Sequence, residues 1–116
     1  MRRGEIWLVD LEPVRGSEAN KTRPVVVVSG DARNRAAEKH RRGVITVVPL
    51  TSSTVQVFPF QALVVPDAEN GLTVESKAQA EQVRAVDYER FIARRGCLDS
   101  ATMEKISQAL ILHLDL

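Results

Sequence analysis

The sequence predicts a mainly β fold with one C-terminal α-helix, and three observations support this prediction. Between residues 5 and 97 the apolar residues fall in short, strand-length runs, several of them bounded by glycine or proline. Residues 99–114 instead repeat apolar side chains at helical spacing. The chain has 116 residues, 44% of them hydrophobic, which suffices for one packed core and leaves no room for a second. We expect a single domain over residues 1–116, built as a small, strongly bent antiparallel sheet that is partly closed to remove its edges.

The first expected element is a strand at Glu5–Asp10. Gly4 and Pro13 bound this apolar run, and these residues favour a strand where periodicity alone does not exclude a short buried helix. Residues 11–22 follow with proline, glycine, serine and asparagine, which are residues of turns and loops. This connection is rather long for a plain hairpin turn, and loops of this kind tend to be functional or disordered.

The next two strands frame the centre of the predicted sheet. Arg23 and Pro24 open the run Val25–Ser29, whose four valines are typical of a strand buried on both faces, so we expect it to be the central strand. A proline is tolerated there because it stands at the start of the strand. Gly43–Thr51 is the third strand, and Pro49 limits its pairing near the end.

A basic segment lies between these strands. Residues 31–42 mix alanine with charged residues, a composition that suits a short helix capped by Asp31 and followed by a basic loop. Because the net charge of the whole chain is only +1, bulk charge does not indicate nucleic-acid binding and any basic surface has to be local. The segment has two acids, Asp31 and Glu38, against the cations Arg33, Arg35, Lys39, Arg41 and Arg42.

Four short strands are expected in the second half, at Phe60–Val65, Leu72–Ser76, Gln82–Val86 and Phe91–Cys97. Residues 52–59 form an exposed loop before the first of them. The first two flank residues 66–71, whose proline and Asn-Gly pair supply turn geometry, so we predict a β-hairpin there. Residues 87–90 are expected to form a single helical turn between the last two strands.

Residues 99–114 form the clear helix of the sequence. Asp99 is its expected N-cap, and Leu98 and Met103 can form a hydrophobic staple around that cap. We expect the apolar face of this helix to pack on the strands. That face consists of Met103, Ile106, Leu110 and Leu114.

Several classes of site and location lack support in the sequence. The single Cys97 leaves no internal disulfide and no multi-cysteine zinc site, and it fits a reducing compartment. His40 and His113 have no histidine or cysteine at ligand spacing, so neither a metal nor another cofactor is expected. The N-terminus lacks the apolar stretch of a signal peptide, and Val25–Val28 is far too short to span a bilayer. We expect a cytoplasmic protein.

The remaining candidates are polar residues where predicted strands meet loops. They are Glu18 in the first loop, Arg23 before the second strand, and Thr51 with Ser52 after the third. Strand ends hold side chains rigidly and leave them accessible, which suits a small site. Residue chemistry alone leaves other interpretations open, because Arg23 suits a surface cation, Thr51 an edge residue and Glu18 a solvated acid.

An ordered series of motifs is more specific than these single residues. Pro13 and the motifs below occur in the order found in MazF/PemK-type toxins, which the chain strongly resembles over nearly its whole length. The motifs are RGEIWLVDL at 3–11, GSE at 16–18, RPVVVVS at 23–29, VVPLTS at 47–52, FPF at 58–60 and AEQVR at 80–84. The resemblance implies an SH3-like small β-barrel with a C-terminal helix, a homodimer, and a toxin that inhibits growth by cutting single-stranded RNA at short sequences without the ribosome. It also implies a MazE-like antitoxin partner with an acidic, extended tail.

The resemblance carries its functional positions onto Arg23 and Thr51, with Glu18 as a further active-site residue. When the 2′-hydroxyl of an RNA attacks the adjacent phosphorus, the enzyme has to orient the nucleotide, move a proton and stabilise charge on the phosphoryl oxygens. A guanidinium at position 23 is suited to grip two of these oxygens. Thr51 supplies a hydroxyl for positioning, and Glu18 is the available carboxylate for a general base, a role that stays open.

The loops offer residues for holding RNA, since proteins read single-stranded bases by stacking and hydrogen bonds. The cations of residues 33–42 are suited to follow an RNA backbone, although a solvated loop needs no ligand. A structural role stays open for the aromatic and amide candidates. Two other functions also stay open: a non-catalytic, CcdB-like inhibitor that binds DNA gyrase on the same barrel, and an inactive nucleic-acid-binding module. The substrate-binding candidates are Ser17, Ser52, Gln56, Phe58, Gln79 and Gln82.

Overall fold

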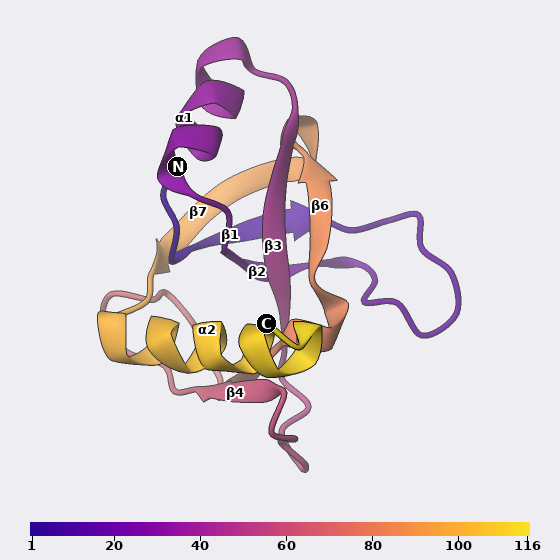
Figure 1. Ribbon diagram of the computed structural model, residues 1–116, viewed down its shortest axis with the longest axis vertical. Coiled ribbons are helices and arrows are strands. Elements are labelled where there is room, and N and C mark those ends of the chain that lie inside the picture. Colours follow the sequence, from indigo (N-terminus) through magenta and orange to yellow (C-terminus); the bar gives the residue numbers. More distant parts are fainter.

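Seven antiparallel strands form the framework of the molecule (Figure 1). The structure is a computed structural model that describes all of residues 1–116. The strands are β1 (Glu5–Asp10), β2 (Thr22–Val27), β3 (Val44–Thr51), β4 (Gln61–Val64), β5 (Ser76–Gln79), β6 (Arg84–Asp87) and β7 (Phe91–Cys97). Their order is β4-β5-β3-β2-β1-β7, and β6 also pairs with β3. The α-helices are α1 (Asp31–His40) and α2 (Ser100–Leu114), and short 3-10 helices cover Ala80–Gln82 and Tyr88–Arg90. The predicted fold class is confirmed.

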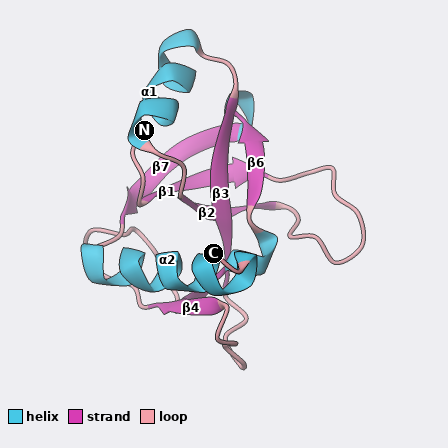
Figure 2. Cartoon of the chain, viewed as in Figure 1, coloured by secondary structure: helices cyan, strands magenta, loops and turns pink.

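The core lies on both faces of the three central strands, because successive side chains of a strand point to opposite faces. One buried cluster joins Ile6, Val26 and Val48 to Ile106 of α2. The other cluster contains Val25 and the further strand residues whose side chains point to the opposite face of the sheet. These side chains pack with Ala37 of α1. Figure 2 places α1 and α2 at opposite ends of the strands, with α2 beside β4. The three valines of β2 and the following Val28 are therefore buried, with side chains on both faces of the strand, as predicted.

The central strand starts earlier than the sequence predicts. β2 begins at Thr22 and ends at Val27, so Pro24 lies inside the strand and pairs with Leu8 of β1. The pairing of β2 with β3 starts only at Val25. At Pro24 the strand is therefore paired on one side only, the edge-like position in which a proline is tolerated.

The second hairpin strand lies further along the chain than the sequence predicts. β4 pairs with β5 from Gln61 opposite Gln79 to Val64 opposite Ser76, so residues 65–75 form the connection and the prediction of a strand at Leu72–Ser76 was wrong. The buried Asn70 closes a local turn inside this connection, since its side chain accepts bonds from the Asp67 and Leu72 N–H groups. The Asn-Gly pair thus shapes a loop and does not join the two strands directly.

The strand predicted at Gln82–Val86 is β6, which begins two residues later because Ala80–Gln82 forms a 3-10 turn. The expected helical turn before β7 is present at Tyr88–Arg90. No helix of the structure combines the length and the apolar composition that a membrane span requires.

The N-cap of α1 differs from the prediction. Gly30 occupies the cap position in an extended conformation, and no side chain caps the helix. Asp31 is instead the first helical residue, and its Oδ1 accepts a hydrogen bond of 2.8 Å from the Arg3 N–H. The Asp31 carboxylate therefore ties the N-terminal segment to α1.

The N-cap of α2 agrees with the prediction. Asp99 accepts a hydrogen bond of 2.7 Å from the Thr102 N–H, and this bond holds the pKa of the Asp99 carboxyl below its ordinary value. Leu98 is buried in the same cluster against which Met103 packs. Leu114, however, is 48% exposed, so it does not belong to the packed face of the helix, which buries Ile106 and Ala109.

Candidate active site

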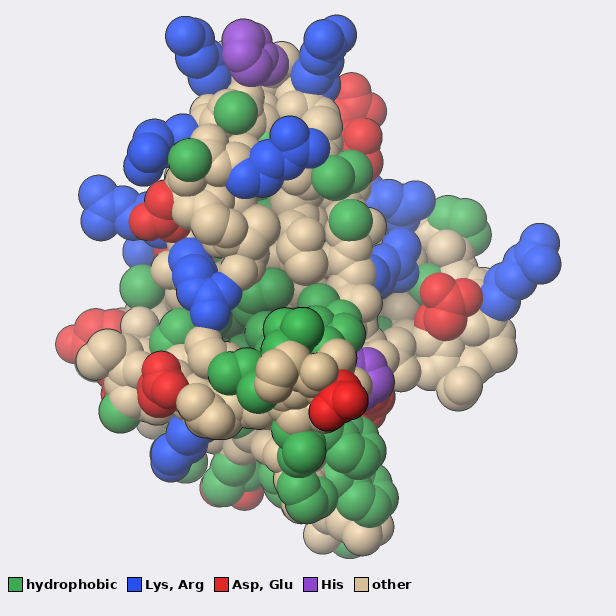
Figure 3. Space-filling model, in the orientation of Figure 1, with side chains coloured by type: hydrophobic (Ala, Val, Ile, Leu, Met, Phe, Trp, Pro, Cys, Tyr) green, Lys and Arg blue, Asp and Glu red, His purple; other side chains and the backbone are tan.

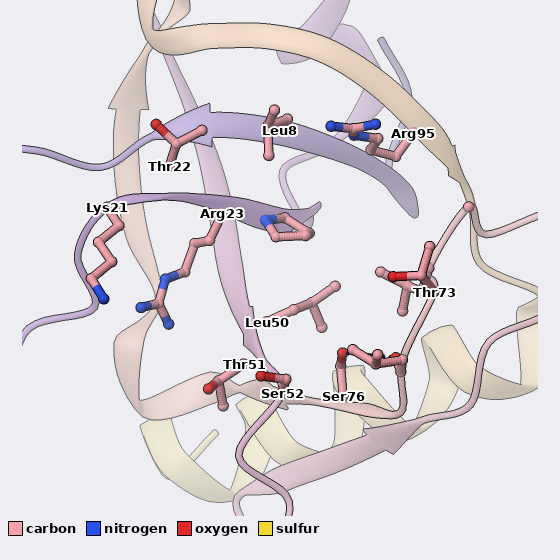
Figure 4. A pocket seen from close by; sticks show the side chains of 14 residues that line it. Leu8, Lys21, Thr22, Arg23, Leu50, Thr51, Ser52, Thr73, Ser76 and Arg95 are labelled. Carbon is pink, nitrogen blue, oxygen red and sulfur yellow. Dashed lines mark hydrogen bonds between the residues drawn. The ribbon is translucent and has the colours of Figure 1, made fainter.

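A pocket of about 510 Å³ opens where β2 and β3 separate (Figure 4). Its walls come from β1, β2, the end of β3, the connection around residues 71–76, and β7. The lining contains no aspartate or glutamate. Its polar side chains are Lys21, Thr22, Arg23, Thr51, Ser52, Thr73, Ser76 and Arg95.

The register of β2 and β3 brings Arg23 and Thr51 to the same level. Val25 pairs with Pro49, and the same antiparallel register, continued for two residues, sets position 23 opposite position 51. The hydrogen-bonded pairing stops before that level, because β3 turns away to pair Thr51 with Lys77 of β5. The two strands thus diverge at a proline on each side, and the opening leaves room for a ligand between Arg23 and Thr51. In Figure 4 the guanidinium of Arg23 is directed toward this opening.

Arg23 is held by the loop that precedes it. Its Nε donates to the Asn20 carbonyl oxygen at 2.7 Å, and its Nη2 donates to Asn20 Oδ1 at 3.2 Å. The side chain is half-buried, Nη1 keeps free donors, and no carboxylate lies within ion-pair distance. The guanidinium is therefore fixed in position and its charge is available to an anion.

Thr51 and two further cations complete the polar lining. The Thr51 Oγ1 accepts a weak bond of 3.3 Å from the Ser53 N–H, so its own O–H is free to donate into the pocket. Lys21 and Arg95 also lack ion-pair partners. Three cations without a counter-charge in one concave site favour an anionic ligand such as a phosphodiester.

Glu18 lies outside this pocket. It is exposed in the first loop, where its Oε1 accepts a bond of 2.8 Å from the Arg15 N–H. Gln82 fixes the same loop, because its Nε2 donates to the Ser17 carbonyl at 3.1 Å and its Oε1 accepts from the Ala19 N–H at 2.9 Å. Both ends of the Gln82 amide are thus engaged within the protein, and Ser17 is exposed.

The other substrate-binding candidates lie in the segment between β3 and β4 and at the end of β5. Lys77, only 8% exposed, donates from Nζ to the Gln56 carbonyl oxygen at 2.6 Å and lies 5.9 Å from the centroid of the Phe58 ring. Phe58 is stacked on Phe60 with centroids 5.3 Å apart, and its own ring is 40% exposed, so it is not a core residue. The buried Oε1 of Gln79 has no hydrogen-bond partner.

Sequence reasoning missed five polar residues of the lining. Lys21 and Thr22 directly precede Arg23, so their position in the sequence next to a predicted site residue could have identified them. No local signal marks the other three. Thr73 and Arg95 meet at the pocket because the 65–75 connection packs against β7, and Ser76 reaches it at the start of β5, which pairs with β3 beyond the pocket. Gly71 permits that packing, because a side chain there would collide with the Arg95 backbone.

The family of the chain follows from its match to a family model. The model described as "PemK-like, MazF-like toxin of type II toxin-antitoxin system" matches residues 2–114. The chain belongs to this family. Endoribonuclease MazF9 of Mycobacterium tuberculosis is a relative that is 53% identical over 116 residues, which covers all of this chain and 98% of the relative.

Solved structures of this family share the fold. MazF from Deinococcus radiodurans aligns with a TM-score of 0.82 at 21% identity, covering 100% of this chain and 97% of that chain. An endoribonuclease in complex with its cognate antitoxin, from a mycobacterial species, aligns with a TM-score of 0.76 at 25% identity, covering 100% and 96%. The resemblance to MazF/PemK-type toxins stated from the sequence motifs is thereby confirmed.

Proposed function

We propose that this chain, as one domain over residues 1–116, is the toxin of a type II toxin-antitoxin system and cleaves single-stranded RNA without the ribosome. Family membership and a 53% identical relative named as an endoribonuclease support RNA cleavage. The observation that carries the proposal is a concave site with three unpaired cations and no acid, in which Arg23 and Thr51 lie at one level of the sheet. The relatives named as endoribonucleases do not favour a gyrase inhibitor.

The proposed reaction uses a nucleophile that belongs to the substrate. The 2′-oxygen bonds to the adjacent phosphorus, the bond from phosphorus to the 5′-oxygen breaks, and the products are a 2′,3′-cyclic phosphate and a 5′-hydroxyl. The free Nη1 donors of Arg23 face the phosphoryl oxygens as their negative charge grows. Thr51 donates its O–H to a phosphoryl oxygen or to the 2′-oxygen and so orients the nucleotide.

The pocket lining holds no carboxylate and no histidine that could take the proton of the 2′-hydroxyl as a base. The 2′-hydroxyl loses a proton and the leaving 5′-oxygen gains one. Glu18 is the carboxylate assigned to the general base, and in this structure its Oε1 is bonded to the Arg15 N–H. Because Glu18 lies outside the pocket, a role as the base requires that the first loop bring its carboxylate toward the pocket when RNA binds.

The loop of residues 52–60 is the proposed platform for the bases next to the cut. Phe58 presents a partly exposed ring beside the pocket end of β3, and aromatic rings stack on splayed RNA bases. The side chains of Gln56 and Ser52 are exposed on the same loop, whereas the Gln79 side chain would have to turn outward to reach RNA, because its unpaired Oε1 is buried. Stacking on Phe58 with hydrogen bonds from these polar groups would select a short sequence.

Two protein partners belong to the proposal. A second copy of this chain would cover exposed apolar side chains near the end of α2, where His113 lies 6.3 Å from the Phe60 ring. These side chains include Val57, Ile111, Leu112, Leu114 and Leu116. An antitoxin with an acidic, extended tail would compete with RNA for the positive pocket, and a related endoribonuclease is known in complex with its antitoxin.

The deciding experiment is incubation of the purified protein with a long defined RNA, followed by mapping of the cut ends. A short RNA that contains the mapped site, with one deoxynucleotide 5′ to the cut phosphate, should resist cleavage. Excess EDTA should change nothing, because attack by the 2′-hydroxyl needs no metal-generated hydroxide. Cleavage of the deoxy strand, or activity lost in EDTA and restored by magnesium, would refute this mechanism. Sedimentation should give about twice 12.9 kDa for the dimer.

A further inference from the structure

A second group of cations lies at the other end of β3 from the pocket. We call it the α1 cationic surface and define it as Arg2, Arg3, Arg33, Arg35, Lys39, Arg41 and Arg42. Figure 3 shows Lys and Arg side chains gathered at the end of the molecule where α1 lies. Residues 1–3 and 31–42 hold seven of the sixteen Lys and Arg residues and two of the fifteen Asp and Glu residues. The rest of the chain is therefore net negative, although the whole has a net charge of +1.

The two acids of this region form no ion pair with its Lys and Arg side chains. Glu38 forms its ion pair with the N-terminal amino group at 3.0 Å, and Asp31 accepts from the Arg3 N–H. The side chains of the five cations in residues 33–42 are exposed and make neither an ion pair nor a hydrogen bond within the chain. Their charge is thus free for a partner.

Helix stability accounts for only some of these cations, because Lys39 in the last turn suits the helix dipole and Arg35 stands four residues after Asp31. Arg33 lies in the first turn of α1, where the positive end of the helix dipole repels a cation. Arg35 and Lys39 stand four residues apart, a spacing at which like charges destabilise a helix. Arg41 has a positive φ of 52°, in the position after the helix where glycine is the usual residue. A bound polyanion would relieve the repulsions between these charges.

The surface also has a hollow of suitable shape. It lies where α1 meets the start of β3, and Arg33, His40 and Arg42 stand around it. The remaining lining residues are Ala36, Ala37 and Gly43, whose small side chains leave room for a bulky group between the cations. The floor of the hollow is apolar, so the two guanidiniums at its edge are the groups that can hold a phosphate.

We propose that the α1 cationic surface binds the phosphate backbone of the RNA that flanks the cut, without reading its sequence. This inference rests on the proposed function. The seven residue steps from Val44 to Thr51 span about 23 Å at 3.3 Å per residue. A stacked strand rises about 3.4 Å per nucleotide, so roughly seven nucleotides bridge the pocket and this surface. Long RNA therefore reaches both places, and a short oligonucleotide reaches only the pocket.

The test measures RNA binding by fluorescence anisotropy for the double variant Arg33→Gln/Arg42→Gln. The two probes are a hexamer of the mapped site and a 30-nucleotide RNA with the same site at its centre, each with the single deoxynucleotide. For the long RNA we expect affinity to fall on the order of tenfold at low salt. The slope of log affinity against log salt should become shallower by about 1.4, because each of the two phosphates that the variant no longer neutralises accounts for about 0.7. Affinity for the hexamer should not change.

Lys105→Glu is the matched control, because it lowers the net charge by the same two units on the exposed side of α2. Wild-type affinity of the double variant for the long RNA would overturn the inference, as would an equal loss on the hexamer or an equal loss in the control. A loss of affinity for the antitoxin alone would overturn it too. Binding is read without cleavage, and a backbone contact reads no sequence, so a hexamer and a 30-nucleotide RNA of arbitrary sequence serve as probes if the wild-type protein does not cut RNA. Such inactivity would refute the proposed function and leave this test intact.

Discussion

The two ends of β3 both carry positive charge, but the cations at the two ends are held differently. At the Thr51 end, Arg23 is half-buried and Asn20 fixes two of its nitrogens. At the Val44 end, the cations of α1 are exposed and their side chains make no hydrogen bonds within the chain. A fixed guanidinium suits the stabilisation of charge at one defined phosphoryl group, whereas mobile cations attract a polyanion wherever its phosphates lie. From this comparison we expect that orientation, and not charge alone, separates a catalytic cation from one that attracts the substrate.

Arg23→Ala tests the fixed cation and should have the largest effect. We expect cleavage to fall by about 10² to 10³-fold, the usual cost of one donor that stabilises developing charge. The fold and the dimer should persist, since the side chain bonds only to its own loop. Rates on a short substrate and circular dichroism check both points, with Lys105→Gln as the control for the loss of one exposed cation. Near-normal cleavage would remove Arg23 from the site.

Thr51→Ala should lose no more activity than Arg23→Ala, and a loss of about tenfold to a hundredfold is expected. The variant removes one hydroxyl donor and leaves the pairing of β3 with β5 intact. Thr51→Ser keeps the hydroxyl and is the matched control. If Thr51→Ser loses as much activity as Thr51→Ala, the methyl group and the packing matter and the hydroxyl does not.

Substitution of Asn20 should weaken the hydrogen bonds that hold the Arg23 guanidinium in position. Asn20→Ala removes the acceptor for Nη2 and keeps the backbone carbonyl for Nε, so a loss of several-fold in kcat with little change in KM is expected. Asn20→Asp keeps the acceptor but adds a carboxylate beside Arg23, which should raise KM because the pocket loses positive charge. Identical kinetics of the two variants would contradict this positioning role.

Asp99 is an intermediate case, because its carboxylate is exposed like the α1 cations and yet held by a backbone N–H as Arg23 is held by Asn20. Its pKa is lowered in the folded state, so the cap stabilises the protein above the ordinary value of 3.8 and this contribution is lost as pH falls through the folded pKa. Asp99→Asn should therefore flatten the acid side of the stability profile slightly. Urea midpoints at pH 7 and pH 3 measure the difference, and an unchanged profile would contradict it.

The strands that the sequence predicted correctly are those with strong local signals. Glu5–Asp10 and Phe91–Cys97 have the predicted bounds, and Gly43–Thr51 differs by one residue, because apolar runs and flanking turn residues define them. β5 was missed because Ser76–Gln79 has a polar sequence, and its strand conformation comes from pairing with β4 and β3. Local propensity cannot report such a partner-induced strand.

The candidate site residues also fall into those that the sequence motifs identified and those whose position only the tertiary structure shows. The family motifs pointed to Arg23, Thr51 and Ser52, and the structure brings these three into one pocket. Glu18 and Gln82 are neighbours of the same loop outside that pocket, with their polar atoms used by backbone groups. The bonds from Gln82 to this loop join residues more than sixty positions apart, which no local pattern encodes.

The sequence by itself determined the mainly β class, the capped C-terminal helix, the family and the two residues at the ends of β2 and β3. Composition, periodicity and ordered motifs are local properties, and they suffice for these conclusions. Only the tertiary structure decided that β2 and β3 diverge beyond Val25, that Arg95 reaches the pocket, and that the α1 cations have no counter-charges. Each of these depends on which distant segments meet, because charge and shape in a folded protein are sums over neighbours in space.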